Sequence, residues 1–381
     1  MNNELFDLKV GDISFKNPIA LGPMAGITDS NFANKYAKNA GLVILGGFNL
    51  DEETNEAASR MAERDRKEYV TDNPLEFLKD EINNTNTEGA VAANIRSATL
   101  EPLLEAAEII KNADAILELD AHCRQKEMID IGVGEALMHD IPRLVEWIEK
   151  LKETGVILSV KIRANVVDDI ELSRKIESAG ADILHVDATL EGKNKADLKA
   201  IRKIRDSVRM TLIGNNSITE FSDAKDMFSR GVNLVSVSRG VLDNHNLIDE
   251  LVEGVTDFQE KIGWYNAPKH ICAGEGDLRG LTFCCLPIKP CAVQNKLKKL
   301  GITPEEFKDL KMEFAKGTKL EFGDSTCFGS LVWCCKLTKF CPIRDGVLYM
   351  LDMSGPEYMQ LKKELANYIL ENANIPVNET E

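Results

Sequence analysis

Residues 116–126 read ILELDAHCRQK, and a segment with two glycines, GVGEAL, follows at 132–137. The first half is a short apolar run typical of a buried strand, and it ends in Asp120, His122 and Cys123. Since α/β proteins place their reactive groups at the carboxyl ends of parallel strands, the pattern predicts a strand followed by a functional loop. The alternative is a structural role for Cys123, because free cysteine is among the most buried residue types.

Similar strands recur between residues 17 and 262 and alternate with amphipathic, helix-length segments. We expect strands at 17–22, 42–46, 90–95, 115–120, 156–162, 183–187, 211–214 and 234–238, and helices at 100–111, 141–153, 168–179, 195–206 and 220–230. Eight β-α units in about 250 residues predict an α/β fold of the (β/α)8 TIM barrel type. An open doubly wound sheet is the alternative, but no Gly-x-Gly-x-x-Gly follows the first strand.

Composition indicates an ordinary globular protein. The chain has 381 residues, of which 44% are hydrophobic and 28% charged, enough for one large core and a smaller appendage. We expect a barrel domain at 1–262, a cysteine-rich, mainly helical domain at 263–345, and a closing helix and tail at 346–381. No apolar run approaches the roughly 18 residues that span a bilayer, and no signal peptide is visible, which predicts a cytoplasmic protein without membrane association. The net charge of −16 argues against a surface devoted wholly to nucleic acid.

Polar residues stand where the predicted strands end, the usual site of catalysis in a barrel. The loops after the last two strands contain Asn215, Asn216, Ser238, Arg239 and Gly240, and such loops commonly bind phosphate. Lys161 lies inside the fifth strand, where a buried lysine is rare without a partner. It could stabilise negative charge on a reduced flavin. Alternatively, Lys161 or Arg163 pairs with Asp187 or Asp120 across the barrel.

These motifs together resemble the tRNA-dihydrouridine synthases, which are FMN-dependent (β/α)8 enzymes. The resemblance begins at LGPMAGITD (21–29), continues through DAHC (120–123) and GVGEAL, and extends over VKIR (160–163), IGNNSI (213–218) and VSRG (237–240). It covers residues 17–242. The segment at 16–18, KNP, also resembles the dihydroorotate dehydrogenases, a neighbouring branch of FMN barrels.

The resemblance implies FMN as the cofactor and assigns residues to it. Flavin-binding residues would be Pro23, Met24, Ala25, Asn94, Lys161, Asp187, Asn215, Asn216, Ser238, Arg239 and Gly240. Cys123 would protonate C5 of a reduced pyrimidine while hydride from N5 of the flavin reaches C6. Asp120 and His122 would orient a small-molecule or pyrimidine-like substrate.

The chain departs from the family pattern at three places. Where the family has Asn-x-Gly-Cys-Pro, residues 120–124 are DAHCR. Asp187 stands in place of a flavin-contacting histidine, with His185 two residues earlier, and Asn94 replaces a flavin-contacting glutamine. These changes leave the FMN site intact as a prediction but argue against uridine in tRNA as the substrate.

The C-terminal part contains an internal repeat of cysteines. Each copy has one cysteine, a gap, an adjacent pair, and a fourth cysteine after five residues: Cys272, Cys284, Cys285 and Cys291, then Cys327, Cys334, Cys335 and Cys341. Four thiolates suit a [4Fe–4S] cluster or a zinc ion. Adjacent cysteines fit zinc poorly, and the flanking prolines are common near iron–sulfur clusters, which favours two [4Fe–4S] clusters. Zinc, redox-silent cysteines and disulfides are the alternatives.

The same part is basic, with 11 Lys/Arg against 6 Asp/Glu between residues 284 and 344. It could face an RNA, a polyanionic cofactor or an acidic electron-donor protein, or it is a solvated surface that offsets the charge of the clusters. Its segments CCLPIKPC (284–291) and KLGITPEEF (299–307) resemble the methanogenesis marker protein 9 family of methane-producing archaea.

Three functions are therefore considered. The leading hypothesis is an FMN-dependent oxidoreductase that reduces or oxidises a ring C=C bond with electrons supplied through iron–sulfur clusters. The second is a non-catalytic electron-transfer or assembly factor in methanogen metabolism. The third, which the changed motif disfavours, is a tRNA-dihydrouridine synthase.

Overall fold

The computed structural model describes residues 8–190, 192–193, 195–208, 210–228, 230–262, 299–303, 306, 309–310, 313–314, 316–317 and 354–373. The chain forms two compact units, one of Lys9–Val255 and one of Met1–Leu8 with Thr256–Glu381. The eight clustered cysteines all lie outside the described residues. The predicted metal clusters therefore stay predictions.

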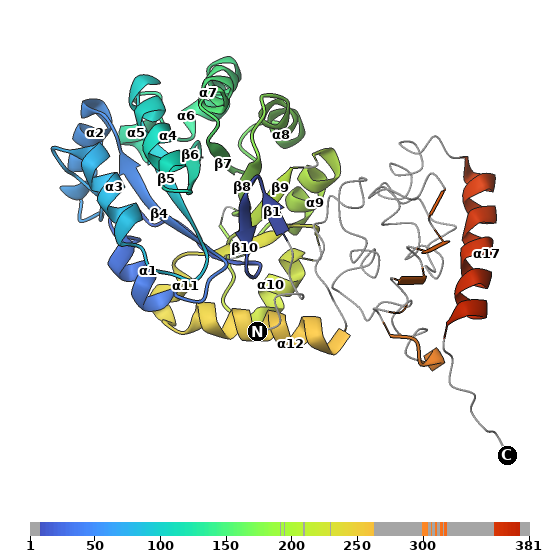
Figure 1. Ribbon diagram of the computed structural model, residues 1–381. Coiled ribbons are helices and arrows are strands. Elements are labelled where there is room, and N and C mark those ends of the chain that lie inside the picture. The colour runs from blue at the N-terminus through green and yellow to red at the C-terminus, as the bar shows by residue number, and fades with distance from the viewer. Residues whose placement is uncertain are drawn as a thin grey trace. The chain divides into compact units, whose positions relative to one another are not determined.

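Eight parallel strands close into a barrel in the first unit (Figure 1). They are β3 (Ile19–Leu21), β4 (Leu42–Asn49), β5 (Ala90–Arg96), β6 (Ile116–Asp120), β7 (Ile157–Arg163), β8 (Ile183–Asp187), β9 (Thr211–Asn215) and β10 (Leu234–Val237). Each pairs with the next, and β10 pairs with β3 through Val235 and Ile19. The predicted (β/α)8 barrel is confirmed and the open sheet is excluded.

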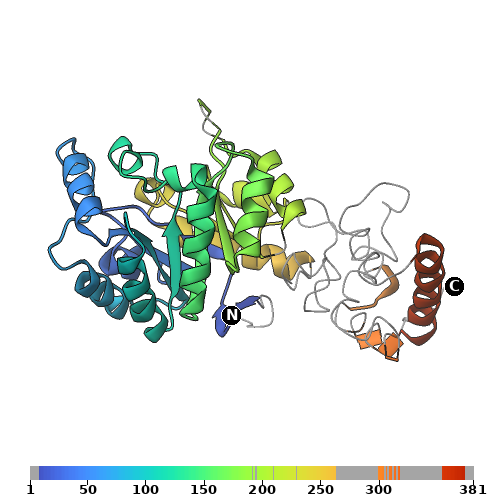
Figure 2. The ribbon, with the colours of Figure 1, turned by 90° about the horizontal axis from the view of Figure 1, so that it is seen from above.

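Helices form the outer layer in both views (Figure 1 and Figure 2). They are α1 (Ser30–Tyr36), α2 (Glu52–Ala62), α3 (Pro74–Asn84), α4 (Glu101–Asn112), α7 (Ile141–Glu153), α8 (Asp169–Ser178), α9 (Leu198–Ser207), α10 (Phe221–Phe228) and α12 (Leu247–Ile262). Helix α7 shows why the sequence pattern was informative. Its N-cap, Asp140, accepts the N–H of Arg143 at 3.3 Å, and its buried residues Leu144, Ile148 and Leu151 recur at helical spacing.

Several short elements were not predicted, because three or four residues show no periodicity. Strands β1 (Leu8–Val10) and β2 (Ile13–Phe15) form a separate two-stranded sheet. Helices α5 (Lys126–Ile129) and α6 (Ala136–His139) lie in the loop after β6, and α11 (Gly240–Asp243) follows β10. The loop that carries Cys123 is thus itself built of two helical turns.

The second unit contains α17 (Gly355–Asn372), which lies within the segment 346–381 where a closing helix was predicted. A capping box begins it: the N–H of Ser354 donates to Glu357 Oε2 at 2.8 Å, and the N–H of Glu357 donates to Ser354 Oγ at 3.4 Å. In the same unit, the N–H of Glu306 donates to Thr303 Oγ1 at 3.1 Å, the contact typical of a helix N-cap. Of the helices described, none combines the length and apolarity needed to cross a bilayer.

Candidate active site at the carboxyl end of the barrel

Polar residues occupy every second position of four neighbouring strands. They are Asn94 and Arg96 on β5, Glu118 and Asp120 on β6, Ser159, Lys161 and Arg163 on β7, and His185 and Asp187 on β8. Alternate residues of a strand share a face, and all of these except the half-buried Asp187 are buried. The barrel interior is therefore polar along these four strands toward their carboxyl ends.

Glu118 lies at the centre of a hydrogen-bond network in this polar interior. Its side chain is 0% exposed. Oε1 accepts from Asn94 Nδ2 at 2.9 Å, while Oε2 accepts from Ser159 Oγ at 3.1 Å and lies 2.8 Å from His185 Nδ1. Burial raises the pKa of Glu118, but His185, Lys161 and Asn94 together hold it below its usual value. Glu118 is thus an ionised carboxylate inside the barrel.

His185 extends this network toward β9 and β10. Its Nε2 lies 2.7 Å from Ser236 Oγ, which accepts from Asn215 Nδ2 at 2.7 Å. Burial lowers the pKa of His185 despite the nearby Glu118. A neutral imidazole that donates through Nδ1 and accepts through Nε2 satisfies every member of this chain of hydrogen bonds.

Lys161 is 2% exposed, directly beside Asp120 in the β6–β7 register. Its ammonium makes no hydrogen bond or ion pair with any residue that the structure describes. The alternative prediction, a Lys161 ion pair with Asp187 or Asp120, is therefore wrong. Arg163 instead pairs with Glu135 at 3.2 Å. A buried ammonium that has no hydrogen bond or ion pair among the described residues is available to the negative charge of a ligand.

The loop after β6 is fixed around Cys123. Asp120 Oδ1 accepts the N–H groups of His122 at 2.9 Å and Cys123 at 3.0 Å. Gly134 has φ +66°, and a Cβ there would lie 2.3 Å from the Cys123 carbonyl oxygen. The same oxygen accepts the N–H of Glu135 at 2.9 Å. The two-glycine segment is thus required for the chain to return close to Cys123.

His122 lies between two carboxylates. Its Nδ1 is 3.5 Å from Asp120 Oδ1, its Nε2 is 3.3 Å from Asp187 Oδ2, and its side chain is 31% exposed. Burial and Lys161 lower the pKa of His122, but the two carboxylates outweigh them and raise it. Burial likewise opposes ionisation of Asp120 and Asp187, yet their contacts with His122 hold both pKa values well below normal. The two carboxylates therefore favour the imidazolium form of His122, which connects the ends of β6 and β8.

Cys123 is 7% exposed and lies between an apolar cluster and a buried cation. It packs with Ala57, Ala58 and Met61 of α2 and with Met128 and Val133 of its own loop. On the other side, Arg96 Nη1 donates to its Sγ at 3.4 Å. Burial raises the pKa of the thiol and Arg96 opposes the rise. The apolar cluster is what a purely structural cysteine would have, whereas the contact with Arg96 is expected of a cysteine that takes part in catalysis.

The residues predicted to bind FMN converge on the same end of the barrel. A Cβ on Gly22 would lie 2.4 Å from Ser238 Oγ, so the ends of β3 and β10 approach closely. Asn216 and Ser217 have positive φ values of +109° and +53°, a strained turn of the kind that gathers at ligand-binding loops. Arg239 is exposed at the start of α11. The close approach of the backbone, the strained turn at 216–217 and Lys161 without an ion pair to a described residue fit a flat ring with a phosphate tail.

Some of the predicted side chains already have partners. Asn94 and Asn215 donate their amides to Glu118 and Ser236, respectively. Asp187 Oδ1 accepts from Thr189 Oγ1 at 2.6 Å and from Asn216 Nδ2 at 3.0 Å. In the first loop, the N–H of Met24, beside Pro23 and Ala25, donates to Thr28 Oγ1 at 3.0 Å. These residues shape the site, and only their remaining atoms are free for a ligand.

Three important residues, Arg96, Glu118 and Glu68, were not predicted from the sequence. Arg96 Nε donates to Asn49 Oδ1 at 2.6 Å, and its Nη2 pairs with Glu68, whose side chain is fully buried. A signal existed for two of them, since a charge at alternate positions of an apolar strand marks Glu118 and Arg96 as pointing inward. Glu68 lies in an irregular loop and had no such signal.

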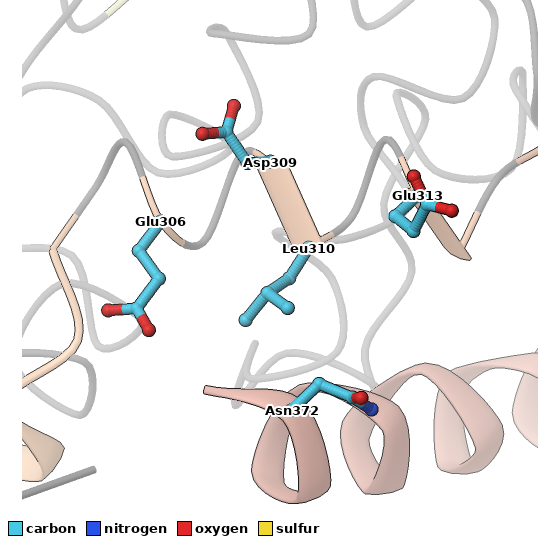
Figure 3. Close-up of a pocket in the computed structure, with 5 residues that line it drawn as sticks. All are labelled: Glu306, Asp309, Leu310, Glu313 and Asn372. Atoms are coloured by element: carbon cyan, nitrogen blue, oxygen red, sulfur yellow. The ribbon is translucent and has the colours of Figure 1, made fainter. Parts of the chain in front are cut away.

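A pocket in the second unit is unrelated to these residues. It is open and lined by Glu306, Asp309, Leu310, Glu313 and Asn372, with Leu310 among three acidic side chains (Figure 3). None of the predicted site residues belongs to it. Within the described part of the chain, no three His, Cys, Asp or Glu side chains are placed to hold a metal ion.

Comparison with known proteins gives a consistent result. Residues 20–267 match the dihydrouridine synthase (Dus) family. An uncharacterized protein of Methanocaldococcus jannaschii is 34% identical over 64% of this chain and 94% of its own length. A probable tRNA-dihydrouridine synthase of Rickettsia conorii is 26% identical over 67% of this chain and 75% of its own. The crystal structure of DHODH from Eimeria tenella in complex with ferulenol has a similar fold, with a TM-score of 0.51 at 13% identity over 70% of this chain and 87% of that one.

Proposed function

Since the chain belongs to the dihydrouridine synthase family, we propose that it is an FMN-dependent oxidoreductase that reduces or oxidises a C=C bond of a ring. One observation supports this most: Cys123, His122 and Lys161 meet at the carboxyl end of one barrel. They supply a thiol, an imidazolium and an ammonium without a described protein partner. This combination suits proton transfer next to an electron-rich ring.

The FMN ring would border Pro23, Met24 and Ala25, with Lys161 as the cation that favours negative charge on it. Its phosphate would be held by the segments at 215–217 and 238–240, where N–H groups and Arg239 are available. When bound, FMN supplies or accepts the hydride.

Cys123 would transfer the proton. Its pKa is raised by burial, so the sulfur holds a proton at neutral pH and can donate it to a ring carbon of the substrate. Asp120 fixes the backbone of this loop through two N–H groups, and His122, held between Asp120 and Asp187, would orient a polar group of the substrate. A pyrimidine-like ring, which carries carbonyl and N–H groups, fits these donors and acceptors.

Electrons would reach the flavin through two [4Fe–4S] clusters bound by the repeated cysteines, and a donor protein would reduce them. The arrangement of the thiols in two matching sets of four supports this proposal. The relative in Methanocaldococcus jannaschii is in keeping with a role in methanogens, as for the methanogenesis marker protein 9 family.

A second candidate substrate is uridine in tRNA. The Rickettsia conorii relative is named as a probable tRNA-dihydrouridine synthase, and the basic segment at 284–344 could hold phosphates. tRNA binding that weakens steeply with salt and depends on the lysines of this segment would favour this substrate over a free pyrimidine.

The test is to purify the protein without oxygen and to measure flavin, iron, sulfide and zinc on one sample. The proposal expects flavin absorption, and then single-turnover reoxidation of reduced flavin by a candidate substrate that is lost in Cys123→Ala. Failure to retain flavin with the fold intact would contradict it and favour a non-catalytic electron-transfer or assembly factor.

A further inference from the structure

Arg96 is a buried cation that has no role in the proposed reaction. Its side chain is 2% exposed, and an arginine is almost never buried without ionic partners. Three groups surround its guanidinium: Asn49 Oδ1 at 2.6 Å from Nε, the Glu68 carboxylate at Nη2, and Cys123 Sγ at 3.4 Å from Nη1. Asp120 Oδ2 is farther from Nη1, at 3.9 Å. The Nη1 edge of the guanidinium is thus directed at the sulfur.

We propose that Arg96 is a positioning residue that stabilises the Cys123 thiolate left after proton donation, and that Glu68 holds Arg96 in place. This inference rests on the proposed function, in which Cys123 is the proton donor. In the reducing direction the S–H bond breaks, the proton goes to one carbon of the C=C bond, and the S–H electron pair stays on sulfur. The hydride that FMN supplies goes to the other carbon, so the substrate gains two electrons and the flavin loses two.

The surroundings of the sulfur make such a partner necessary. The other contacts of Cys123 are apolar: Ala57, Ala58 and Met61 on α2, and Met128 and Val133 on the loop. An anion in such a cluster is costly unless a cation neutralises it. The charged groups that act on Cys123 are Arg96, which favours the thiolate, and Asp120 and Glu68, which disfavour it; the N–H of Gln125 also favours it.

Glu68 is well placed to hold Arg96. Its side chain is 0% exposed, and it bridges Arg96 and Arg66. Its backbone lies against the loop after β3, where a Cβ on Gly26 would be 2.4 Å from the Glu68 nitrogen. The carboxylate therefore has a fixed position from which it can orient the guanidinium while partly offsetting its charge.

The opposite effects of Arg96 and Glu68 on the sulfur give a sharp test. Each variant of the full chain is pulse-alkylated with iodoacetamide over a range of pH, and labelling of the Cys123 peptide is read by mass spectrometry, which separates it from the other cysteines. In Arg96→Met, we expect the thiolate fraction at a given pH to fall at least about tenfold, equivalent to one pKa unit. In Glu68→Gln, we expect the thiolate fraction of Cys123 to rise. In Arg96→Lys, we expect this fraction to fall less than in Arg96→Met.

The matched control is Arg143→Met. Arg143 supports the same loop by donating to the carbonyls of Ala98 at 2.5 Å and Gly132 at 3.2 Å, but it has no contact with the sulfur. We expect its thiol titration to match that of the wild type. An unchanged thiol titration in Arg96→Met, or an equal shift in Arg143→Met, would overturn the inference. A fall in Glu68→Gln in place of the expected rise would show that the hold of Glu68 on Arg96 outweighs its own charge, and an unchanged titration in Glu68→Gln would overturn the role of Glu68. If Arg96→Met does not fold, Glu68→Gln and Arg96→Lys still decide it.

The titration needs neither substrate nor flavin, so it separates this inference from the proposed function. Single-turnover flavin reoxidation gives the second readout: its pH limb for Cys123 ionisation should move to higher pH in Arg96→Met. Turnover unaffected by Cys123→Ala would mean that the proposed function has failed. If turnover needs Cys123 but the thiol titration of Arg96→Met matches that of the wild type, only this inference is overturned and the proposed function stands.

Discussion

His122 joins two strand ends that are far apart in the sequence. By the resemblance to the family motif, His122 stands at the position of a glycine, and Asp187 stands at the position of a histidine at the end of strand β8. In the structure these two substituted positions meet, with His122 Nε2 3.3 Å from Asp187 Oδ2. The imidazole is therefore supplied from the cysteine loop, and the strand supplies a carboxylate. This contact could not be recognised from either position alone, because the two residues are 65 positions apart in the sequence.

The charge of His122 gives a testable dependence of stability on pH. Asp120 and Asp187 raise its pKa in the folded protein. A group of this kind stabilises the fold below its unfolded pKa of about 6.5 and loses that contribution as pH rises through the folded pKa. We expect the unfolding free energy of the wild type to exceed that of His122→Gln most below about pH 6, and the difference to shrink as pH rises above about 6.5 through the raised folded pKa.

Denaturant unfolding of both proteins over this pH range measures the difference. Asp187→Asn serves as the matched variant, because it removes one of the two carboxylates and should flatten the pH dependence while His122 is kept. A difference between wild type and His122→Gln that stays constant or grows with pH would show that His122 is not held as an imidazolium.

At the scale of elements, the loop after β6 depends on one glycine. Gly134→Ala would require a left-handed backbone and would place a Cβ 2.3 Å from the Cys123 carbonyl oxygen. We expect a loss of about 2–4 kcal/mol of unfolding free energy, the sum of the backbone cost and the clash, and slower proton transfer from a displaced Cys123. Gly155→Ala is the control, since Gly155 has φ +80° and nothing within 4 Å of its added Cβ. It should lose only about 1–2 kcal/mol; equal losses would mean that the clash is relieved at no cost.

A second prediction at the scale of elements concerns Glu118 on strand β6. In Glu118→Gln, one of the two carboxylate oxygens becomes an NH2 donor, so either Asn94 or the pair Ser159 and His185 loses its acceptor. Lys161 also loses a nearby negative charge. We expect about 3–5 kcal/mol less unfolding free energy at neutral pH. Because the folded pKa of Glu118 is lowered, the carboxylate stabilises the fold above its unfolded pKa of about 4.3, and the difference should shrink as pH falls below that value.

The control for Glu118 is Glu88→Gln. Glu88 pairs with Lys16 at the surface, where an ion pair contributes about 1 kcal/mol or less. Chemical denaturation at several pH values provides the measurement for both. A loss in Glu118→Gln no larger than in Glu88→Gln would mean that the buried network is not important for stability.

The sequence predicted the strands of the barrel better than the contacts between side chains. All eight barrel strands were predicted within three residues, because their apolar runs and the intervening helical periodicity are local signals. The convergence of Cys123, Lys161 and Asp187 followed from the topology of a barrel, which brings strand ends together. Glu68 could not be found, since an irregular loop between α2 and α3 has no periodicity and its contact with Arg96 spans 28 residues. The hydrogen-bond partners of Asn94 and Asn215 also required coordinates.

For the whole molecule, charge is distributed unevenly. The chain has a net charge of −16, but residues 284–344 carry 11 Lys/Arg and 6 Asp/Glu, a balance of +5. The repeated cysteines fall within or beside this segment, and each [4Fe–4S] cluster with four thiolates is an anion. If the proposed clusters form, the positive charge of this segment would lower the cost of reducing them, in keeping with the proposed supply of electrons to the flavin.

The metal content of the intact protein tests this arrangement. Two [4Fe–4S] clusters predict about eight iron and eight sulfide per chain, and the double variant Cys284→Ala with Cys285→Ala should lower both by about half, because it removes two ligands of one set. Cys123→Ala is the matched control: it removes a cysteine that belongs to neither set and should leave iron and sulfide unchanged. The barrel has its own core at Lys9–Val255, so flavin should be retained in the double variant. Zinc in place of iron would rule out the clusters, and loss of all iron in the double variant would mean that the two sets share their ligands.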